Sequence, residues 1–299
     1  MPKRLPRART LKGDPKLVHY DSGGGMPGEA PIVLLHGATL RSEDWENIFP
    51  RLATRYRVVA YDARGHGKSA RAASYRLDDL VADAVRVLRE IVKAPAILIG
   101  HSLGGATALA TAAREPALVR SAVLEDPWVA RYHDGIWRKD LFAALHAIMP
   151  KQAEPDFARA VGDLPLPFPG PRGERRVREV RGFYSAERLA TYYGTVDPAF
   201  VRELTRPEPE GAAALAAAVG AVEAPLLLLA ADAKVDSALA DGEVERFEAA
   251  GAQVVRFPGH GHRIHGQKPE AFLEAIEPFL RKTRAESAAE RTRSRGSGG

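Results

Sequence analysis

Residues 100–104 read Gly-His-Ser-Leu-Gly, which matches the pattern Gly-x-Ser-x-Gly around Ser102. In this pattern a sharp, strained turn between a strand and a helix exposes the serine hydroxyl for nucleophilic attack. The positions two before and two after the serine approach each other too closely for bulky side chains. An apolar run at 94–99 precedes the motif and an alanine-rich stretch at 106–114 follows it. These flanks predict the strand and the helix that a serine nucleophile of this kind needs.

Strands and helices alternate along much of the chain on both sides of this turn. Short apolar runs predict strands at 17–20, 31–35, 56–61, 94–99, 121–124, 226–231 and 253–257. Helices are expected at 77–92, from Ser102 onward, at 239–250 and at 269–282. In the first of these, apolar residues recur every three or four positions, as on one face of a helix. The alternation predicts an α/β fold with a mostly parallel sheet and helices on both faces.

The alternation is interrupted between residues 127 and 224, where aromatic residues, a proline cluster and an arginine run occur. We therefore predict a core formed by 17–126 and 225–282, with 127–224 as a largely helical insertion. Residues 1–16 are expected to form a basic N-terminal tail. Residues 283–299 are polar enough to predict a disordered C-terminal tail.

Composition excludes several kinds of chemistry. The chain has 299 residues and no cysteine, which excludes disulfides, thiolate metal sites and a cysteine nucleophile. It has neither a secretory signal at its start nor an apolar run of membrane-spanning length, so we expect a cytoplasmic protein with no membrane partner. The net charge of +5 is concentrated in the two tails, and short basic tails alone predict no specific nucleic-acid partner.

Four segments with polar groups follow predicted strands. They are the turn at His36-Gly37, the run 62–69 (Asp-Ala-Arg-Gly-His-Gly-Lys-Ser), the serine turn and the segment 258–262 (Pro-Gly-His-Gly-His). Their order and intervals resemble those of the α/β-hydrolase fold family, from about residue 17 to residue 280. The resemblance implies a mostly parallel, eight-stranded type of sheet. It also implies that the insertion is a cap, placed after the sixth strand.

The same resemblance assigns roles to individual residues. Ser102 is the expected nucleophile, and His262 is the base that activates it, with His260 as the competing histidine. The backbone N–H groups of Ala38 and Leu103 are expected to form the oxyanion hole.

The acid that orients the histidine is the part that departs from the common family pattern. Asp236 or Asp232, after the strand at 226–231, is the expected acid. Some relatives place the acid after the preceding strand, which leaves Glu125 and Asp126 as the alternative. One carboxylate must hold His262 in the tautomer that the reaction needs.

The substrate pocket is expected to include His36, His101, Trp128 and Trp137. The resemblance implies a serine hydrolase that cleaves a small carboxylic ester or lactone through an acyl-serine intermediate. The alternatives are a C–C bond hydrolase or perhydrolase of the same fold, or a non-catalytic ligand-binding receptor or scaffold.

No cofactor is expected. His260, His262 and His265 lie close together in the sequence but lack the spacing of a metal-binding motif, so no metal site is predicted. A small molecule is the expected partner, and the protein is expected to be a monomer or a homodimer.

Overall fold

The computed structural model describes residues 5–129, 139–166, 175–179, 185–205, 215, 217–240 and 242–296. It contains an eight-stranded sheet in the order β1-β2-β4-β3-β5-β6-β7-β8. The strands are β1 (Arg9–Leu11), β2 (Leu17–Asp21), β3 (Ile32–Leu35), β4 (Val58–Asp62), β5 (Ala96–His101), β6 (Val119–Glu125), β7 (Leu226–Ala231) and β8 (Gln253–Phe257). β2 runs antiparallel to β1 and to β4, and the other pairs are parallel. The predicted α/β fold with a mostly parallel sheet is confirmed.

The central strands β3, β5 and β6 are buried almost throughout, as expected for strands covered on both faces. Their register aligns the carboxyl ends: Leu35 lies opposite Gly100, and His101 lies opposite Glu125. The polar segments that follow these strands therefore meet at one edge of the sheet.

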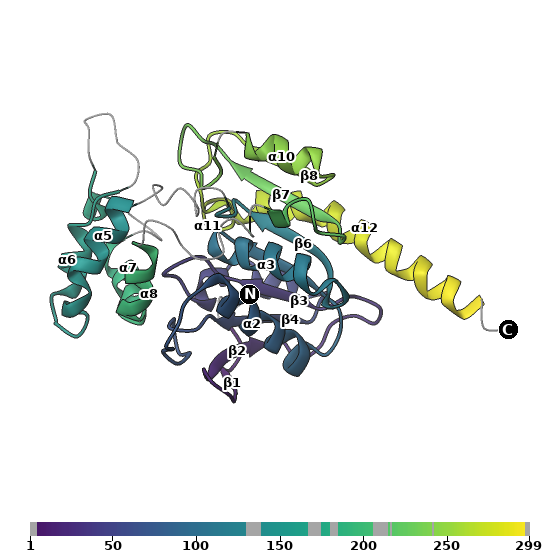
Figure 1. Ribbon diagram of the computed structural model, residues 1–299, viewed down its shortest axis with the longest axis horizontal. Helices are drawn as coiled ribbons and strands as arrows, with labels where there is room; N and C mark the ends of the chain where they lie inside the picture. Colours follow the sequence, from purple (N-terminus) through teal and green to yellow (C-terminus); the bar gives the residue numbers. More distant parts are fainter. Residues whose placement is uncertain are drawn as a thin grey trace.

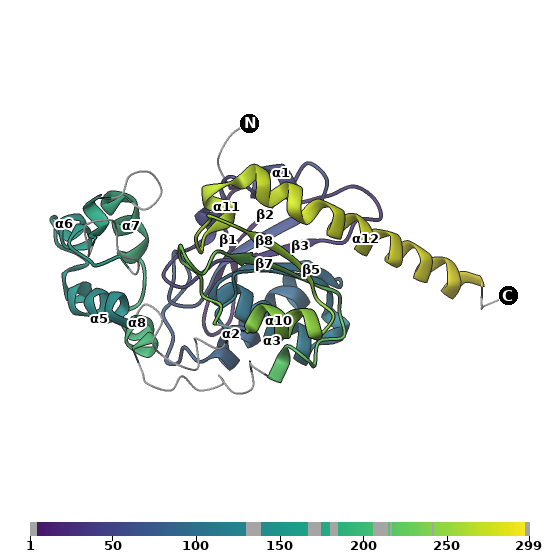
Figure 2. The same cartoon turned by 90° about the horizontal axis from the view of Figure 1, so that it is seen from above.

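Helices cover both faces of the sheet (Figure 2). One face carries α2 (Leu77–Arg86), α3 (Leu103–Arg114) and α10 (Glu243–Ala249). The other carries α1 (Phe49–Leu52), α11 (Ile264–Gln267) and α12 (Pro269–Gly296). Each layer buries its own apolar cluster against the sheet, and this burial is the main stabilising contribution to the core.

Four helices between β6 and β7 form a separate group at one end of the molecule (Figure 1). They are α5 (Lys139–Ile148), α6 (Phe157–Gly162), α7 (Ala186–Tyr193) and α8 (Pro198–Leu204). Their apolar side chains form a third cluster, which also includes Leu40 and Leu103 from the sheet side. Asp197, which caps α8, donates its N–H to Gly65 O and accepts a hydrogen bond from the Tyr75 hydroxyl.

Both ends of the chain differ from the prediction. Part of the expected tail 1–16 forms the strand β1, which pairs with β2. α12 continues to Gly296, whereas disorder was predicted from residue 283. Alanine, glutamate and arginine dominate 284–291 and favour a helix once the preceding turns have nucleated one.

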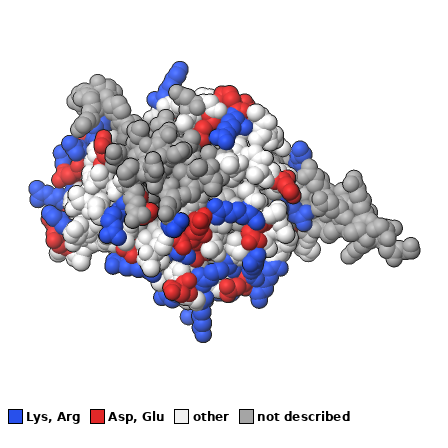
Figure 3. Space-filling model, in the orientation of Figure 1, with Lys and Arg blue, Asp and Glu red and all other residues white. Residues whose placement is uncertain are grey.

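Charged side chains of both signs lie close together on the face shown in Figure 3. Exposed ion pairs among the described residues include Arg114 with Asp78 and Arg256 with Glu248. Among the described residues no helix is both long enough and apolar enough to cross a membrane.

Candidate active site

Ser102 occupies a strained turn between β5 and α3. Its backbone angles are φ 53° and ψ −117°, a conformation that a residue with a side chain rarely adopts. A Cβ atom added at Gly100 would lie 2.2 Å from Gly104 O, and one added at Gly104 would lie 2.2 Å from Leu35 O. The two glycines are therefore required by close backbone contacts, and the turn has the geometry that the Gly-x-Ser-x-Gly pattern predicts.

His262 is oriented by Asp126, the residue that follows β6. Its Nδ1 lies 2.6 Å from Asp126 Oδ2, and both side chains are buried. Three further donors hold the same carboxylate: the Ser237 hydroxyl at 2.7 Å and the backbone N–H groups of Ala238 at 2.7 Å and Ala231 at 3.2 Å. The carboxylate is thus fixed from several sides, and it fixes the histidine ring in turn.

We expected Asp236 or Asp232 to orient His262, and this contact shows that the expectation was wrong. Neither residue supplies the carboxylate bonded to His262 Nδ1. Asp232 accepts hydrogen bonds from the backbone N–H groups of Gly259, at 2.8 Å, and Lys234, at 2.9 Å, and these bonds lower its pKa. It ties the loop after β7 to the loop after β8. Asp126, one of the two alternatives from the preceding strand, takes the orienting position.

Two backbone N–H groups, those of Ala38 and Leu103, were expected to form the oxyanion hole. Within the described part of the chain, those of Ala38 and Leu103 donate no hydrogen bond. Leu103 begins α3, so its N–H lies at the positive end of the helix dipole. Ala38 follows Gly37, where an added Cβ would lie 2.7 Å from His101 Nδ1. This close approach brings the turn after β3 against the turn that carries Ser102.

His36 braces the turn after β3 and does not line the cavity at Ser102, contrary to expectation. Its Nδ1 donates to Gly37 O at 2.8 Å, so its Nε2 accepts the N–H of Ala63 at 3.0 Å. Burial lowers the pKa of His36, and burial together with the neighbouring His36 lowers the pKa of His66 to about 3. Both histidines are therefore neutral structural groups near pH 7.

A cavity of about 50 Å³ lies at Ser102, and residues of α5 and α7 form part of its lining. It is lined by Ala38, Thr39, Leu40, His101, Ser102, Trp128, Leu141, Phe142, Leu189, Tyr193 and His262. Of the four expected pocket residues, His101 and Trp128 lie in this lining. Trp137 lies outside the described residues.

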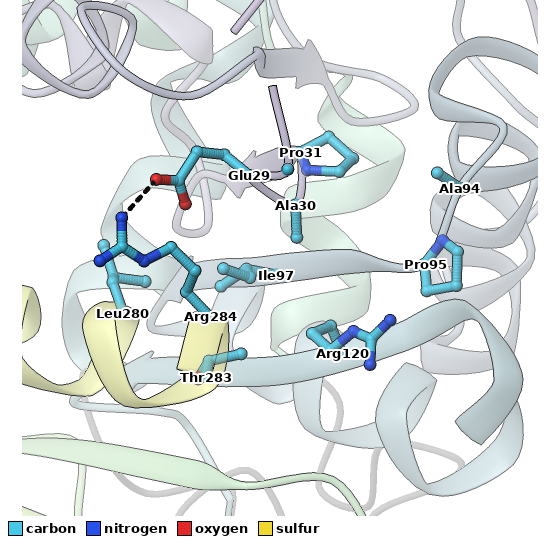
Figure 4. A pocket seen from close by; sticks show the side chains of 11 residues that line it. Glu29, Ala30, Pro31, Ala94, Pro95, Ile97, Arg120, Leu280, Thr283 and Arg284 are labelled. Atoms are coloured by element: carbon cyan, nitrogen blue, oxygen red, sulfur yellow. Dashed lines mark hydrogen bonds and ion pairs between the residues drawn. The ribbon is translucent and has the colours of Figure 1, made fainter. Parts of the chain in front are cut away.

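A larger hollow of about 190 Å³ lies at the opposite end of the strands (Figure 4). It is lined by Pro31, which precedes β3, by Pro95, which precedes β5, and by residues of α12. Arg284 of α12 pairs with Glu29 across its mouth, with a nitrogen–oxygen distance of 3.3 Å. Its described lining contains neither a serine nor a histidine, so the smaller cavity is the candidate active site.

A further histidine after β8, His265 in α11, lies in a fully buried polar cluster. Asp44, His101 and His265 each offer one buried atom, and these atoms lie within 4.8 Å of one another, as metal ligands could. The Arg263 guanidinium is bonded to the same Asp44 carboxylate, with a shortest distance of 2.5 Å. This fixed positive charge opposes a metal cation, so we assign no metal to the cluster.

Comparison with known proteins supports the geometry at the level of the family. Residues 32–275 match the model of the family described as "Alpha/beta hydrolase family". The chain belongs to this family.

Similarity to individual proteins of this α/β-hydrolase family covers either most of the chain or about a third of it. The chain is 29% identical over 274 residues to 2-(acetamidomethylene)succinate hydrolase from Mesorhizobium japonicum, covering 85% of this chain and 89% of that enzyme. It is 40% identical over 110 residues to 2-hydroxymuconate semialdehyde hydrolase from a Pseudomonas species, covering 35% of this chain and 38% of that enzyme. A structure described as an N-acyl homoserine lactone degrading enzyme superimposes with a TM-score of 0.68 at 19% identity, covering 91% of this chain and 100% of the other. The last likeness shows the fold alone.

Proposed function

We propose that the protein is a serine hydrolase that cleaves a small carboxylic ester or lactone through an acyl-serine intermediate. One observation carries the proposal: Ser102, on its strained turn, shares a cavity with His262, and Asp126 holds that histidine at 2.6 Å. A serine hydroxyl is a weak nucleophile until an adjacent base removes its proton, and this arrangement provides the base.

In the first half of the proposed reaction, His262 Nε2 takes the proton of Ser102 Oγ as Oγ attacks the carbonyl carbon of the ester. Negative charge then develops on the carbonyl oxygen, and the N–H groups of Ala38 and Leu103 stabilise it. Preorganised donors of this kind contribute about 3 kcal/mol each to lowering the barrier. Asp126 stabilises the imidazolium and keeps Nδ1 protonated throughout.

The second half of the reaction releases the acid. The tetrahedral intermediate collapses as His262 gives its proton to the departing alkoxide, which leaves the acyl group on Ser102 Oγ. A water molecule then attacks the acyl carbon while His262 takes the proton of the water. Collapse of the second intermediate returns the proton to Ser102 and frees the carboxylic acid.

The residues that line the cavity at Ser102 favour a substrate with a small, uncharged acyl group. Among its described residues there is no lysine or arginine, and Leu141, Phe142 and Leu189 present apolar surface. A substrate carboxylate would lose its water there without gaining a cationic partner, which is costly. We therefore expect esters of short uncharged acids to be better substrates than monoesters of dicarboxylic acids, including succinates.

The test uses a fluorophosphonate probe, which reacts only with an activated serine. The wild-type protein should be labelled at Ser102, as located by peptide mass spectrometry, and Ser102→Ala should not be labelled. Turnover of p-nitrophenyl acetate should exceed that of a p-nitrophenyl hemisuccinate. Failure of the folded wild-type protein to react with the probe would overturn the proposal in favour of a binding role. Labelling without turnover of any ester or lactone would favour the C–C bond hydrolase alternative.

A further inference from the structure

A second carboxylate–histidine pair lies one residue along the chain from the pair in the candidate site. Glu125, the last residue of β6, accepts the backbone N–H of His265 on Oε1 at 2.7 Å and the ring Nδ1 of His265 on Oε2 at 2.6 Å. Both side chains are completely buried. One carboxylate thus fixes the backbone and the ring of the residue three positions beyond His262.

The other ring nitrogen of His265 faces a second carboxylate. Its Nε2 lies 3.2 Å from Asp44 Oδ2, within ion-pair distance, and the Trp45 ring stacks on the imidazole with centroids 4.1 Å apart. Arg263 bonds the other oxygen of Asp44 through Nε, at 2.6 Å. Arg263, which precedes α11, and His265, which lies in it, are therefore both anchored on the segment that follows β3.

His101 connects this cluster to the serine turn. Its Nε2 lies 3.1 Å from the backbone oxygen of His262, a hydrogen bond in which the ring nitrogen donates. Its Nδ1 lies 3.9 Å from Asp44 Oδ2. Since His101 directly precedes Ser102, the backbone that carries the nucleophile and the backbone that carries the base are joined through one side chain.

The charges of the cluster balance when His265 carries a proton. Asp44 and Glu125 are negative, while Arg263 and a protonated His265 are positive. Burial opposes protonation of His265, but Glu125 and Asp44 outweigh burial and raise its pKa. A balanced buried cluster keeps a single geometry, whereas loss of one member leaves a buried charge without its partner.

We propose that His265 is a positioning residue: held between Glu125 and Asp44, it fixes the loop that carries His262 against the turn that carries Ser102. The inference rests on the proposed function, because it assigns His265 a role in that reaction. His265 does not line the cavity and touches no reacting atom. Its effect is on the approach of His262 to Ser102, to which proton transfer is sensitive.

Three substitutions separate the two contacts of His265. His265→Asn places an amide nitrogen near the position of Nδ1 and keeps a donor for Glu125. His265→Gln places one near the position of Nε2 and keeps a donor for Asp44. His265→Phe keeps a ring stacked on Trp45 but loses both contacts. His260→Asn is the matched control, because His260 lies on the loop that carries His262, is partly exposed, and within the described structure its ring hydrogen-bonds only Pro258 O.

The measurements are kcat, KM and the rate of fluorophosphonate labelling at Ser102, each on protein shown to be folded by circular dichroism. Misplacing a catalytic group by about 1 Å costs about 100-fold in rate, so we expect a loss of about this size in kcat for His265→Phe. The Asn and Gln variants should lose less. KM should stay at its wild-type value, labelling should slow in parallel with kcat, and His260→Asn should behave as wild type.

Two kinds of failure can be told apart. If the wild-type protein is labelled and the folded His265 variants keep wild-type kcat, the positioning role is wrong while the proposed function stands. A rise in KM at constant kcat would also overturn it, since that result assigns His265 to substrate binding. If the wild-type protein is not labelled, the proposed function itself is wrong and the positioning role falls with it.

Discussion

Two neighbouring carboxylates at the end of β6 each hold a histidine that follows β8, and the two distances are the same. Asp126 holds His262 at 2.6 Å and Glu125 holds His265 at 2.6 Å. The surroundings differ: His262 lines the cavity at Ser102, whereas His265 is fully buried between Glu125, Asp44 and the Trp45 ring. The Asp126–His262 pair is therefore the open pair, because its histidine lines a cavity, and the Glu125–His265 pair is the sealed pair.

The surroundings of the second ring nitrogen decide what each imidazole can do. In His262 a carboxylate holds Nδ1, and Nε2 is the nitrogen that takes and gives the proton in the proposed reaction. In His265 carboxylates face both nitrogens, which holds a proton in place. A carboxylate–histidine pair can act as a base in the first setting, and it can only brace the structure in the second.

The largest expected effect comes from the open pair. Asp126→Asn replaces the acceptor at Nδ1 with an amide that favours the wrong tautomer of His262, and a change of this kind costs about 10,000-fold in kcat. Hydrolysis of p-nitrophenyl acetate measures it. Glu125→Gln should lose far less kcat, because it acts only through His265. Equal losses in the two variants would remove the distinction between the pairs.

The sealed pair should dominate stability instead. Glu125→Gln removes a buried charge beside the imidazolium of His265, and breaking such a pair costs about 3–5 kcal/mol of unfolding free energy. Asp126→Asn keeps the size of the side chain and weakens the hydrogen bonds that the carboxylate accepts, which we expect to cost about 1–3 kcal/mol. Urea denaturation at pH 7 compares the two. The reverse order of stabilities would contradict the assignment of the charged cluster.

The pH dependence of stability should reveal the charge on the sealed histidine. Because Glu125 and Asp44 raise the pKa of His265 in the folded state, despite the opposing effect of burial, its charged contacts stabilise the fold fully below the ordinary value of 6.5. This contribution falls by about 1.4 kcal/mol per pH unit as the pH rises from 6.5 to the folded-state pKa. The stability difference between wild type and His265→Gln, from urea titrations at successive pH values, should therefore shrink with rising pH. A difference that grows with pH would show that His265 is buried in its neutral form.

Much of the fold followed from local patterns. The apolar run at 226–231 coincides with β7, because a buried parallel strand is a continuous apolar segment. The prediction at 253–257 coincides with β8, an edge strand in which Gln253 and Arg256 are exposed. β1 (Arg9–Leu11) was not predicted, since three residues with two exposed side chains carry no such signal. β1 forms because the edge of β2 is available for pairing, and the local sequence does not contain that information.

The site was predictable as far as it depended on motifs. Ser102 and its two glycines can be recognised in the sequence, because the backbone of the turn requires their spacing. The orienting acid cannot be recognised in this way, because its position depends on which strand end faces the loop that carries His262. Asp126 donates its backbone N–H to Leu229 O, and this pairing across β6 and β7 turns its carboxylate toward His262. The consecutive carboxylates at 125–126, at the end of a buried strand, were the available signal.

The smallest expected effect belongs to the two carboxylates that the sequence favoured. Asp232 bonds the backbone N–H groups of Gly259 and Lys234, and an asparagine can retain an acceptor for one of them. Asp236 is partly exposed on the same loop, near Gly261. We therefore expect Asp232→Asn and Asp236→Asn to keep kcat near the wild-type value on p-nitrophenyl acetate, with at most a small loss of stability. If either variant lost as much kcat as Asp126→Asn, that residue would orient the base during turnover, and the pair at Asp126 and His262 would describe only the resting state.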